Sequence, residues 1–315
     1  MVYDVTLIII GLLLVGKGGD LFVDASVYMG KLFRIPRFII GGTLVSLATT
    51  TPELAVSAIA SAAGDSGIAL GNAVGSCVCN IGLIVGTVAL LTRVEVERRD
   101  LLRRAAWMVS AGVLVVVFTW DRTLSRPLAA VLLVLALAYL SWDYLGLRAL
   151  RRDEWTEVVA ADPTAFLWQV GQFGLGAILI LLGSNLLVDS GSGLARTFGV
   201  PSVIVGLTVV AIGTSLPELV TGVAAARKGV PDLSLGNIIG ANVLNLYLIV
   251  GLSGTIRPLT LDLFTQVYSF GWLGLFFAAV LGLALRTGHF HRRGGALLLG
   301  LWLSYVAGLG VVTLG

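Results

Sequence analysis

Charged residues are scarce in this sequence of 315 residues, at 12% against the roughly 25% that is usual for soluble domains. Hydrophobic residues reach 57%, and the mean hydropathy is +0.96. Apolar runs of about 20 residues recur along the chain, whereas short strands of alternating hydrophobicity are missing. The composition excludes an ordinary soluble domain and an outer-membrane barrel, and it predicts an all-α integral membrane protein.

Histidine and cysteine occur only twice each. His289 and His291 lie in a basic loop, so the apolar runs contain no histidine that could bind a metal or act as a base. Cys77 and Cys79 lie inside an apolar run and are interpreted as small packing residues, not as a disulfide or a metal pair. Basic residues lie in short loops between apolar runs, so the pI of 9.0 does not indicate nucleic acid. We therefore expect no cofactor and no nucleic-acid partner.

No lysine or arginine precedes the first apolar run, which follows Asp4 in the segment MVYDVTLIII. A cleaved signal peptide requires a basic segment at this place. We therefore expect the first run to be a membrane helix.

The apolar runs predict ten membrane helices, most of them near or above the ~20 residues that a bilayer requires. They are expected at 5–28, 38–63, 68–92, 104–120, 126–147, 166–190, 201–226, 233–255, 266–286 and 295–313.

This division places most of the 21 basic residues on one side of the membrane, including a cluster from Arg93 to Arg104. Only Arg122, Arg126, Arg196 and Arg257 fall in the loops of the other side. Because cytoplasmic loops carry the excess of lysine and arginine, we expect a multi-pass protein of the plasma or inner membrane with both termini outside.

The chain matches itself without a gap when it is shifted by 165 residues. The segment GNAVGSCVCNIGLIVG at 71–86 aligns with GNIIGANVLNLYLIVG at 236–251, with 9 of 16 positions identical. ATTTPEL at 48–54 aligns with GTSLPEL at 213–219. Each copy contains five predicted helices, and an odd number means that the second copy enters the membrane from the opposite side. We therefore expect two inverted-topology five-helix repeats, an architecture typical of secondary transporters.

The expected boundaries follow from this repeat. Residues 1–147 form the first five-helix repeat, 148–165 a cytoplasmic linker, and 166–315 the second five-helix repeat. The most similar segments of the two copies are 38–92 and 201–255.

A proline followed by a glutamate interrupts one helix in each copy. Pro52 and Pro217 lack an N–H group, so a backbone carbonyl one turn earlier loses its helical partner. Such carbonyls are tolerated at membrane depth only when they are buried in protein or line a cavity. Glu53 and Glu218 follow the prolines, and a carboxylate at this depth normally faces a partner or a site.

Every group offered near these glutamates is an oxygen ligand, since hydroxyls and amides surround them and histidine does not. In the third helix Asn72, Ser76 and Asn80 form one polar stripe at a spacing of four residues. Oxygen cages suit hard cations such as Ca²⁺ and Na⁺. Two opposed carboxylates favour a divalent ion, because two like charges held close require two positive charges.

At these residues the sequence resembles the sodium/calcium exchanger family of the cation/Ca²⁺ exchanger superfamily, in its prokaryotic type. The resemblance rests on ATTTPEL…GNAVGSCVCN at 48–80 and GTSLPEL…GNIIGANVLN at 213–245, and it extends over nearly the whole chain. It implies antiport of Ca²⁺ by alternating access, in which the first and sixth helices slide across the rest. It implies Ca²⁺ ligands at Thr49, Glu53, Thr214 and Glu218.

The resemblance also implies Na⁺ ligands, or residues that support them, at Ser46, Thr50, Ser76, Asn80, Ala211, Ser215 and Asn245, with Ala241 at a further family position. Many relatives carry an aspartate at the position of Asn245 and a serine at that of Ala241. Cys77 also stands where the family's GSN motif has an asparagine. The coupling ion is therefore open: Na⁺ is the first expectation, and H⁺ or K⁺ is the alternative.

A charge count suggests a hypothesis about coupling. Glu53 and Glu218 give the core a formal charge of −2, which one Ca²⁺, two Na⁺ or two H⁺ would balance. Exchange would then be electroneutral, unlike that expected for relatives with the additional aspartate.

Structural and functional alternatives remain beside this interpretation. The two glutamates could be bonded across helices, and Asn72 and Asn237 could tie helices together instead of binding ions. A passive cation channel could use the same oxygens, although channels usually arise from identical subunits around an axis. An intramembrane enzyme would require a base beside a nucleophile, an H-E-x-x-H motif or a catalytic carboxylate dyad. The first two are missing. Glu53 and Glu218 could mimic the third, but the freed carbonyls and amides around them suit an ion better. We therefore expect no enzyme activity. The expected partners are inorganic cations and the lipid bilayer, and we expect the monomer to be functional.

Overall fold

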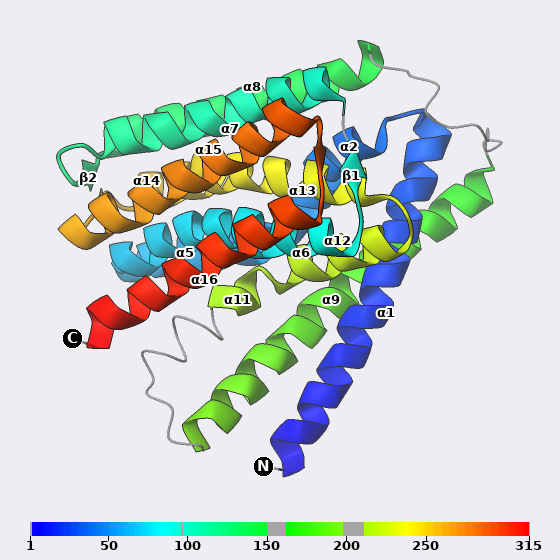
Figure 1. Ribbon diagram of the computed structural model, residues 1–315, viewed down its shortest axis with the longest axis horizontal. Coiled ribbons are helices and arrows are strands. Elements are labelled where there is room, and N and C mark those ends of the chain that lie inside the picture. Colours follow the sequence, from blue (N-terminus) through cyan, green and yellow to red (C-terminus); the bar gives the residue numbers. More distant parts are fainter. Residues whose placement is uncertain (1, 96, 150–161, 198–210, 315) are drawn as a thin grey trace.

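The computed structural model describes residues 2–95, 97–149, 162–197 and 211–314. These residues form a bundle of long helices, most of which run side by side, while α1 (Val2–Phe33) and α9 (Pro163–Thr197) lean away from the others as a pair (Figure 1). Among the described residues, seven helices are long and apolar enough to cross a membrane. The count is eight if the bent pair Arg37–Thr49 and Thr51–Ala63 is one span.

The remaining helices follow the predicted order with small shifts at their ends. They are α2 (Arg37–Ile40), α3 (Ser46–Thr49), α4 (Thr51–Ala63), α5 (Ser66–Cys79), α6 (Gly86–Leu91), α7 (Arg98–Phe118), α8 (Arg126–Ala149), α11 (Ala211–Thr214), α12 (Leu216–Arg227), α13 (Pro231–Leu244), α14 (Val250–Ile256), α15 (Phe270–Thr287) and α16 (Arg292–Leu314). Stretches of π-helix join several of them: η1 (Gly41–Val45), η2 (Asn80–Val85), η4 (Asn245–Ile249) and η5 (Thr265–Ser269).

Two of the predicted spans lie outside the count of seven or eight. The span expected at 201–226 begins on residues outside the described part and continues as α11 and α12. The span expected at 295–313 corresponds to α16, which is 23 residues long. The prediction of ten membrane helices therefore remains a prediction, while the mostly helical membrane architecture is confirmed.

One helix boundary predicted from the sequence is wrong. The fourth span begins at Arg98 rather than at 104, so a cluster assigned to a loop belongs largely to α7. Within it, Arg104 is buried and forms an ion pair with Asp143 of α8. Hydropathy could not reveal this pair, because the two residues meet only when α7 packs beside α8. The expected linker at 148–165 lies between α8, which ends at Ala149, and α9, which begins at Pro163, and its residues 150–161 lie outside the described part.

Pairs of short strands close the two ends of the bundle. β1 (Val94–Glu95) pairs with β4 (His289–Phe290), and β2 (Thr123–Leu124) pairs with β3 (Leu259–Thr260), both antiparallel. β1 and β2 lie at opposite ends of the molecule (Figure 1). β3 follows β1 by 165 residues, and β4 follows β2 by about the same interval, so each pair contains one strand from each half.

Glycines allow α1 and α9 to approach closely. A Cβ atom at Gly18 would lie 2.8 Å from the carbonyl oxygen of Gly176, and one at Gly183 would lie 2.8 Å from that of Gly11. Gly176 and Gly183 lie 165 residues after Gly11 and Gly18, so each contact is the counterpart of the other. Small residues at helix contacts are typical of membrane proteins, because they let backbones meet.

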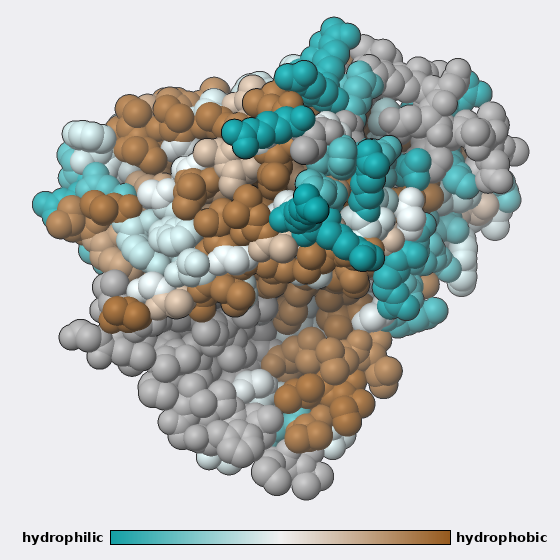
Figure 2. Space-filling model, in the orientation of Figure 1, coloured by the Kyte–Doolittle hydropathy of each residue, from teal (hydrophilic) through white to brown (hydrophobic). Residues whose placement is uncertain are grey.

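The most enclosed helices are those of the two similar segments. Within Ser66–Leu91 72% of the most apolar stretch is buried, and within Pro231–Ile256 89% is buried, against 28% for the first helix. Gly236 and Gly240 of α13 lie directly against backbone carbonyls of Phe38 and Gly42, so these segments pack backbone to backbone. Hydrophilic residues gather at the end of the bundle that holds β1, and hydrophobic residues cover its flank (Figure 2).

Candidate functional site

Two broken helices carry the predicted glutamates. The first breaks at Thr50, whose φ and ψ are −82° and 1°, and the second at Ser215, with −91° and 8°. A new helix begins directly after each break, with a proline at its start and the glutamate in its first turn. Helix N-termini favour negative charge, because their N–H groups are unpaired and the peptide dipoles align. The repeated sequence thus produces the same local structure twice.

Glu53 and Glu218 are both 1% exposed. Among the described residues, no hydrogen-bond partner reaches any of their four carboxylate oxygens. α12, which carries Glu218, packs against α3, which ends one turn before Glu53. Buried charges without partners are strongly destabilising in a protein interior, so these carboxyl groups are stable here either when protonated or beside a bound cation.

Hydroxyl groups of the first repeat direct their hydrogens away from the break. Thr50 donates to the carbonyl oxygen of Ser46 at 2.7 Å, and Ser46 donates to that of Thr43 at 3.0 Å. Thr49 donates to the amide oxygen of Asn237 at 3.2 Å. A hydroxyl that has donated its hydrogen can offer only lone pairs to a further neighbour. Thr49, Thr50 and Ser46, all buried, therefore suit a cation better than an anion.

Two amides mark the start of matching π-helical stretches. Asn80 begins η2 and Asn245 begins η4, and both side chains are buried. Stretches of π-helix interrupt the regular ladder of backbone hydrogen bonds and occur frequently at functional sites. Ser76 lies one turn before Asn80 and is buried, whereas the corresponding position before Asn245 is Ala241, which has no side-chain oxygen.

Asn72 and Asn237 hold helices together. Asn72 donates to the carbonyl oxygen of Glu53 at 3.1 Å and to the hydroxyl of Ser57 at 2.9 Å. Asn237 donates to Thr221 at 3.3 Å and accepts from Thr49. Both amides are engaged between neighbouring helices, so the structure favours the tying role over ion binding.

The predicted residues of the second repeat occupy corresponding places in the chain. Ser215 is buried at the break, and its hydroxyl has no hydrogen-bond partner among the described residues. Thr214 ends α11 and is partly buried, while Ala211 begins α11. The described residues contain no group of three or more His, Cys, Asp or Glu that could hold a metal. Any ion here would therefore be bound by two carboxylates together with neutral oxygens.

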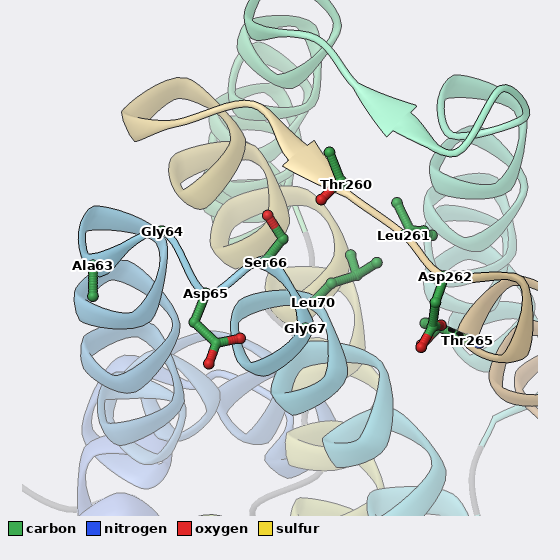
Figure 3. Close-up of a pocket in the computed structure, with 10 residues that line it drawn as sticks. All are labelled: Ala63, Gly64, Asp65, Ser66, Gly67, Leu70, Thr260, Leu261, Asp262 and Thr265. Atoms are coloured by element: carbon green, nitrogen blue, oxygen red, sulfur yellow. Dashed lines mark hydrogen bonds between the residues drawn. The ribbon is translucent and has the colours of Figure 1, made fainter.

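A separate cavity of about 580 Å³ lies at the far end of α4. Figure 3 shows Asp65 and Asp262 on opposite sides of it. Both carboxylates are engaged in helix caps: Asp65 accepts from the N–H of Ile68 at 2.9 Å, and Asp262 from that of Thr265 at 2.7 Å. Ala63 follows Glu53 by ten residues, or about 15 Å along a helix, so this cavity is not the glutamate site.

Known proteins similar to this chain include transport proteins. A family model described as sodium/calcium exchanger protein matches residues 3–145 and 168–311. The inner membrane protein YrbG of Escherichia coli strain K12 is 37% identical over 272 residues, which is 83% of this chain and 82% of YrbG. The sodium/calcium exchanger MaX1 of Methanosarcina acetivorans is 32% identical over 292 residues, which covers 81% of this chain and 83% of MaX1.

The fold is similar to that of a solved exchanger. A structure of the sodium-calcium exchanger NCX_Mj, soaked with zero Na⁺ and Ca²⁺, superposes with a TM-score of 0.82. The alignment covers 98% of this chain and 99% of that chain at 28% sequence identity.

Proposed function

The chain belongs to the sodium/calcium exchanger protein family, and from that premise we propose that it exchanges Ca²⁺ for Na⁺ across a cell membrane as a secondary active antiporter. The family consists of membrane transporters rather than enzymes. YrbG is an inner membrane protein by name, and this supports an inner-membrane location for the present chain.

The proposed Ca²⁺ site is built on Glu53 and Glu218, with Thr49 and Thr214 as further ligands. The observation that carries this proposal is the pair of fully buried carboxylates whose oxygens have no hydrogen-bond partner among the described residues. One Ca²⁺ would neutralise both, and the hydroxyls beside them present lone pairs. Around it, the ligands or supporting residues for Na⁺ would be Ser46, Thr50, Ser76, Asn80, Ala211, Ser215 and Asn245.

The proposed architecture is ten membrane helices in two inverted repeats, 1–147 and 166–315, with both termini outside. The reciprocal contacts of Gly11 with Gly183 and of Gly18 with Gly176 support it, because a two-fold axis between α1 and α9 would generate such pairs. Each strand pair joins one strand of the first half to one strand of the second, and this supports the architecture as well. Alternating access would use the proposed motion of α1 and α9 across the rest, in a functional monomer.

Transport by the purified protein in proteoliposomes tests this function. Uptake of ⁴⁵Ca²⁺ should saturate, should require an opposing Na⁺ gradient, and should show counterflow against unlabelled Ca²⁺. The double variant Glu53→Gln/Glu218→Gln should lose this uptake. Glu95→Gln is the matched control, since it makes the same chemical change at an exposed carboxylate that is paired with Arg93.

The same vesicles distinguish the alternatives. Uptake driven equally well by a proton or K⁺ gradient without Na⁺ would replace Na⁺ by that coupling ion and leave the glutamate site in place. Flux without saturation or counterflow would identify a channel. Full uptake by the double variant would remove the proposed site.

A further inference from the structure

Three buried residues from three helices form a chain of contacts that ends at Asn80. Asn80 donates from Nδ2 to the amide oxygen of Asn242 at 3.0 Å. Asn242 in turn directs its Nδ2 to the sulfur of Met108, 3.7 Å away. Asn242 and Met108 are 0% exposed and Asn80 is 1% exposed, so little water competes for these groups.

The sulfur of Met108 decides which way both amides point. A thioether can accept a hydrogen bond, weakly, but cannot donate one. Asn242 therefore turns its NH₂ group toward Met108 and its oxygen toward Asn80. An oxygen at that place can be satisfied only by a donor, so Asn80 must present its own NH₂ group to Asn242.

The consequence is a fixed oxygen on the other side of Asn80. Its Oδ1 is buried and has no hydrogen-bond partner among the described residues. Asn80 shares the polar stripe of the third predicted helix with Ser76, and η2, which Asn80 begins, packs against α12, the helix that carries Glu218. An amide whose oxygen is held in one direction loses little conformational freedom when it binds a cation.

The second repeat lacks both residues of this chain. The positions that correspond to Asn242, Met108 and Asn80 after the 165-residue shift are Cys77, Leu273 and Asn245. A thiol is a weak hydrogen-bonding group, and leucine offers none. The thiol of Cys77 interacts with the side chain of Asn245, but a thiol can donate as well as accept weakly, so it enforces neither orientation of that amide.

We propose that Asn242 and Met108 are positioning residues that hold the oxygen of Asn80 toward the transported ions. This inference rests on the proposed function. It adds that Asn80 and Asn245, which occupy the same position in the two repeats, differ in how firmly their amides are oriented. The amide oxygen of Asn80 is already oriented before an ion binds, whereas the amide of Asn245 becomes oriented only when an ion binds. Because the proposed Ca²⁺ ligands are Thr49, Glu53, Thr214 and Glu218 and do not include Asn80, the effect concerns Na⁺ more than Ca²⁺.

The test measures half-saturating Na⁺ and Ca²⁺ concentrations for ⁴⁵Ca²⁺ exchange in proteoliposomes. Asn242→Leu should raise the Na⁺ value by about tenfold, the order of one buried hydrogen bond, and the Ca²⁺ value by less than about threefold. Met108→Leu, which nearly conserves volume, should shift the Na⁺ value in the same direction by about threefold. Thermal unfolding of each purified variant verifies that it is folded.

A double-mutant cycle separates positioning from packing. A carboxylate presents two equivalent oxygens and needs no orientation, so Asn242→Leu should change the Na⁺ value by less than about twofold in the N80D background. An equal loss in both backgrounds would mean that Asn242 only fills space, and the proposal would be wrong.

Two further outcomes decide whether the positioning role holds. An unchanged Na⁺ value in both N242L and M108L, with wild-type exchange intact, would overturn the positioning role alone. The proposed function itself would be wrong if the wild-type protein showed no saturable counterflow. In that case calorimetric titration of Na⁺ into detergent-solubilised wild-type and N242L protein still tests whether Asn242 supports cation binding, and equal binding by both would overturn the positioning role.

Discussion

The two halves of the molecule are alike in their broken helices and buried glutamates and unlike in the hydroxyl groups near them. Each half breaks a helix at the same aligned position, after Thr49 in one and after Thr214 in the other, and each buries one glutamate in the turn that follows. The hydroxyls differ, because Ser76 corresponds to Ala241 and Ser46 to Ala211. The repeat therefore preserves the two buried carboxylates of the proposed Ca²⁺ site and varies hydroxyl groups of the proposed Na⁺ sites.

The outer helices of the two halves differ as well. Arg104 pairs with Asp143 and donates to the hydroxyl of Tyr139 at 3.2 Å, and Tyr139 donates to the carbonyl of Gly42 at 3.3 Å. The corresponding positions in the second half are Ser269, Gly308 and Ser304, which carry no charge. One half thus fixes the start of its broken helix to α7 and α8 by a buried ion pair.

The largest expected effect tests whether Glu53 and Glu218 contribute equally to Ca²⁺ exchange. Glu53→Gln and Glu218→Gln should each reduce ⁴⁵Ca²⁺ exchange by ~100-fold or more, because each leaves one carboxylate to bind a divalent ion. The two losses should agree within about threefold, with Glu95→Gln as the unaffected control. Losses that differ by more than about tenfold would show that one half holds Ca²⁺ largely alone.

The next effect tests whether the ion pair on α7 and α8 is structural. Asp143→Leu leaves Arg104 buried without its partner and should lower the free energy of unfolding by about 3–5 kcal/mol. Arg104→Met combined with Asp143→Leu should recover most of that loss, since no unpaired charge remains. Unfolding midpoints in detergent measure both variants. If the single variant is as stable as the double, the pair does not anchor this half.

Sequence reasoning identified the two glutamates and the helix breaks beside them, because local chemistry determines both. Proline removes a backbone donor wherever it occurs, and a carboxylate in an apolar run signals a site. It did not predict that Arg104 is buried in an ion pair, because the partner Asp143 lies 39 residues away in another helix. The contact between Asn80 and Asn242 spans 162 residues. The only sign of this contact in the sequence is that Cys77 in the first repeat aligns with Asn242 in the second.

A third experiment adds a negative charge to the second half of the chain, at Asn245. Asn245→Asp would raise the formal core charge from −2 to −3, so one more monovalent cation should accompany each cycle. Wild-type Ca²⁺ flux should not respond to an imposed membrane potential at fixed ion gradients, whereas the N245D flux should. A K⁺ gradient with valinomycin sets the potential. Voltage-dependent flux in the wild type would contradict the electroneutral hypothesis.

Asn80→Asp is the matched variant in the first half. It adds the same charge at the aligned position, so it should confer a similar voltage response. A response to N245D alone would mean that the two amide positions do not bind equivalent ions.

The smallest expected effect concerns a single hydroxyl. Ser76→Ala should raise the half-saturating Na⁺ concentration by about three- to tenfold, because one buried oxygen ligand contributes on the order of 1 kcal/mol. Ala241→Ser should lower it by about two- to threefold, since it returns a hydroxyl to the second half without an oriented amide beside it. Na⁺ titrations of ⁴⁵Ca²⁺ exchange measure both, and the half-saturating Ca²⁺ concentration should stay within about twofold in each. If Ala241→Ser improves Na⁺ dependence as strongly as Ser76→Ala weakens it, the two halves bind Na⁺ equivalently, and their difference in neutral ligands has no functional consequence.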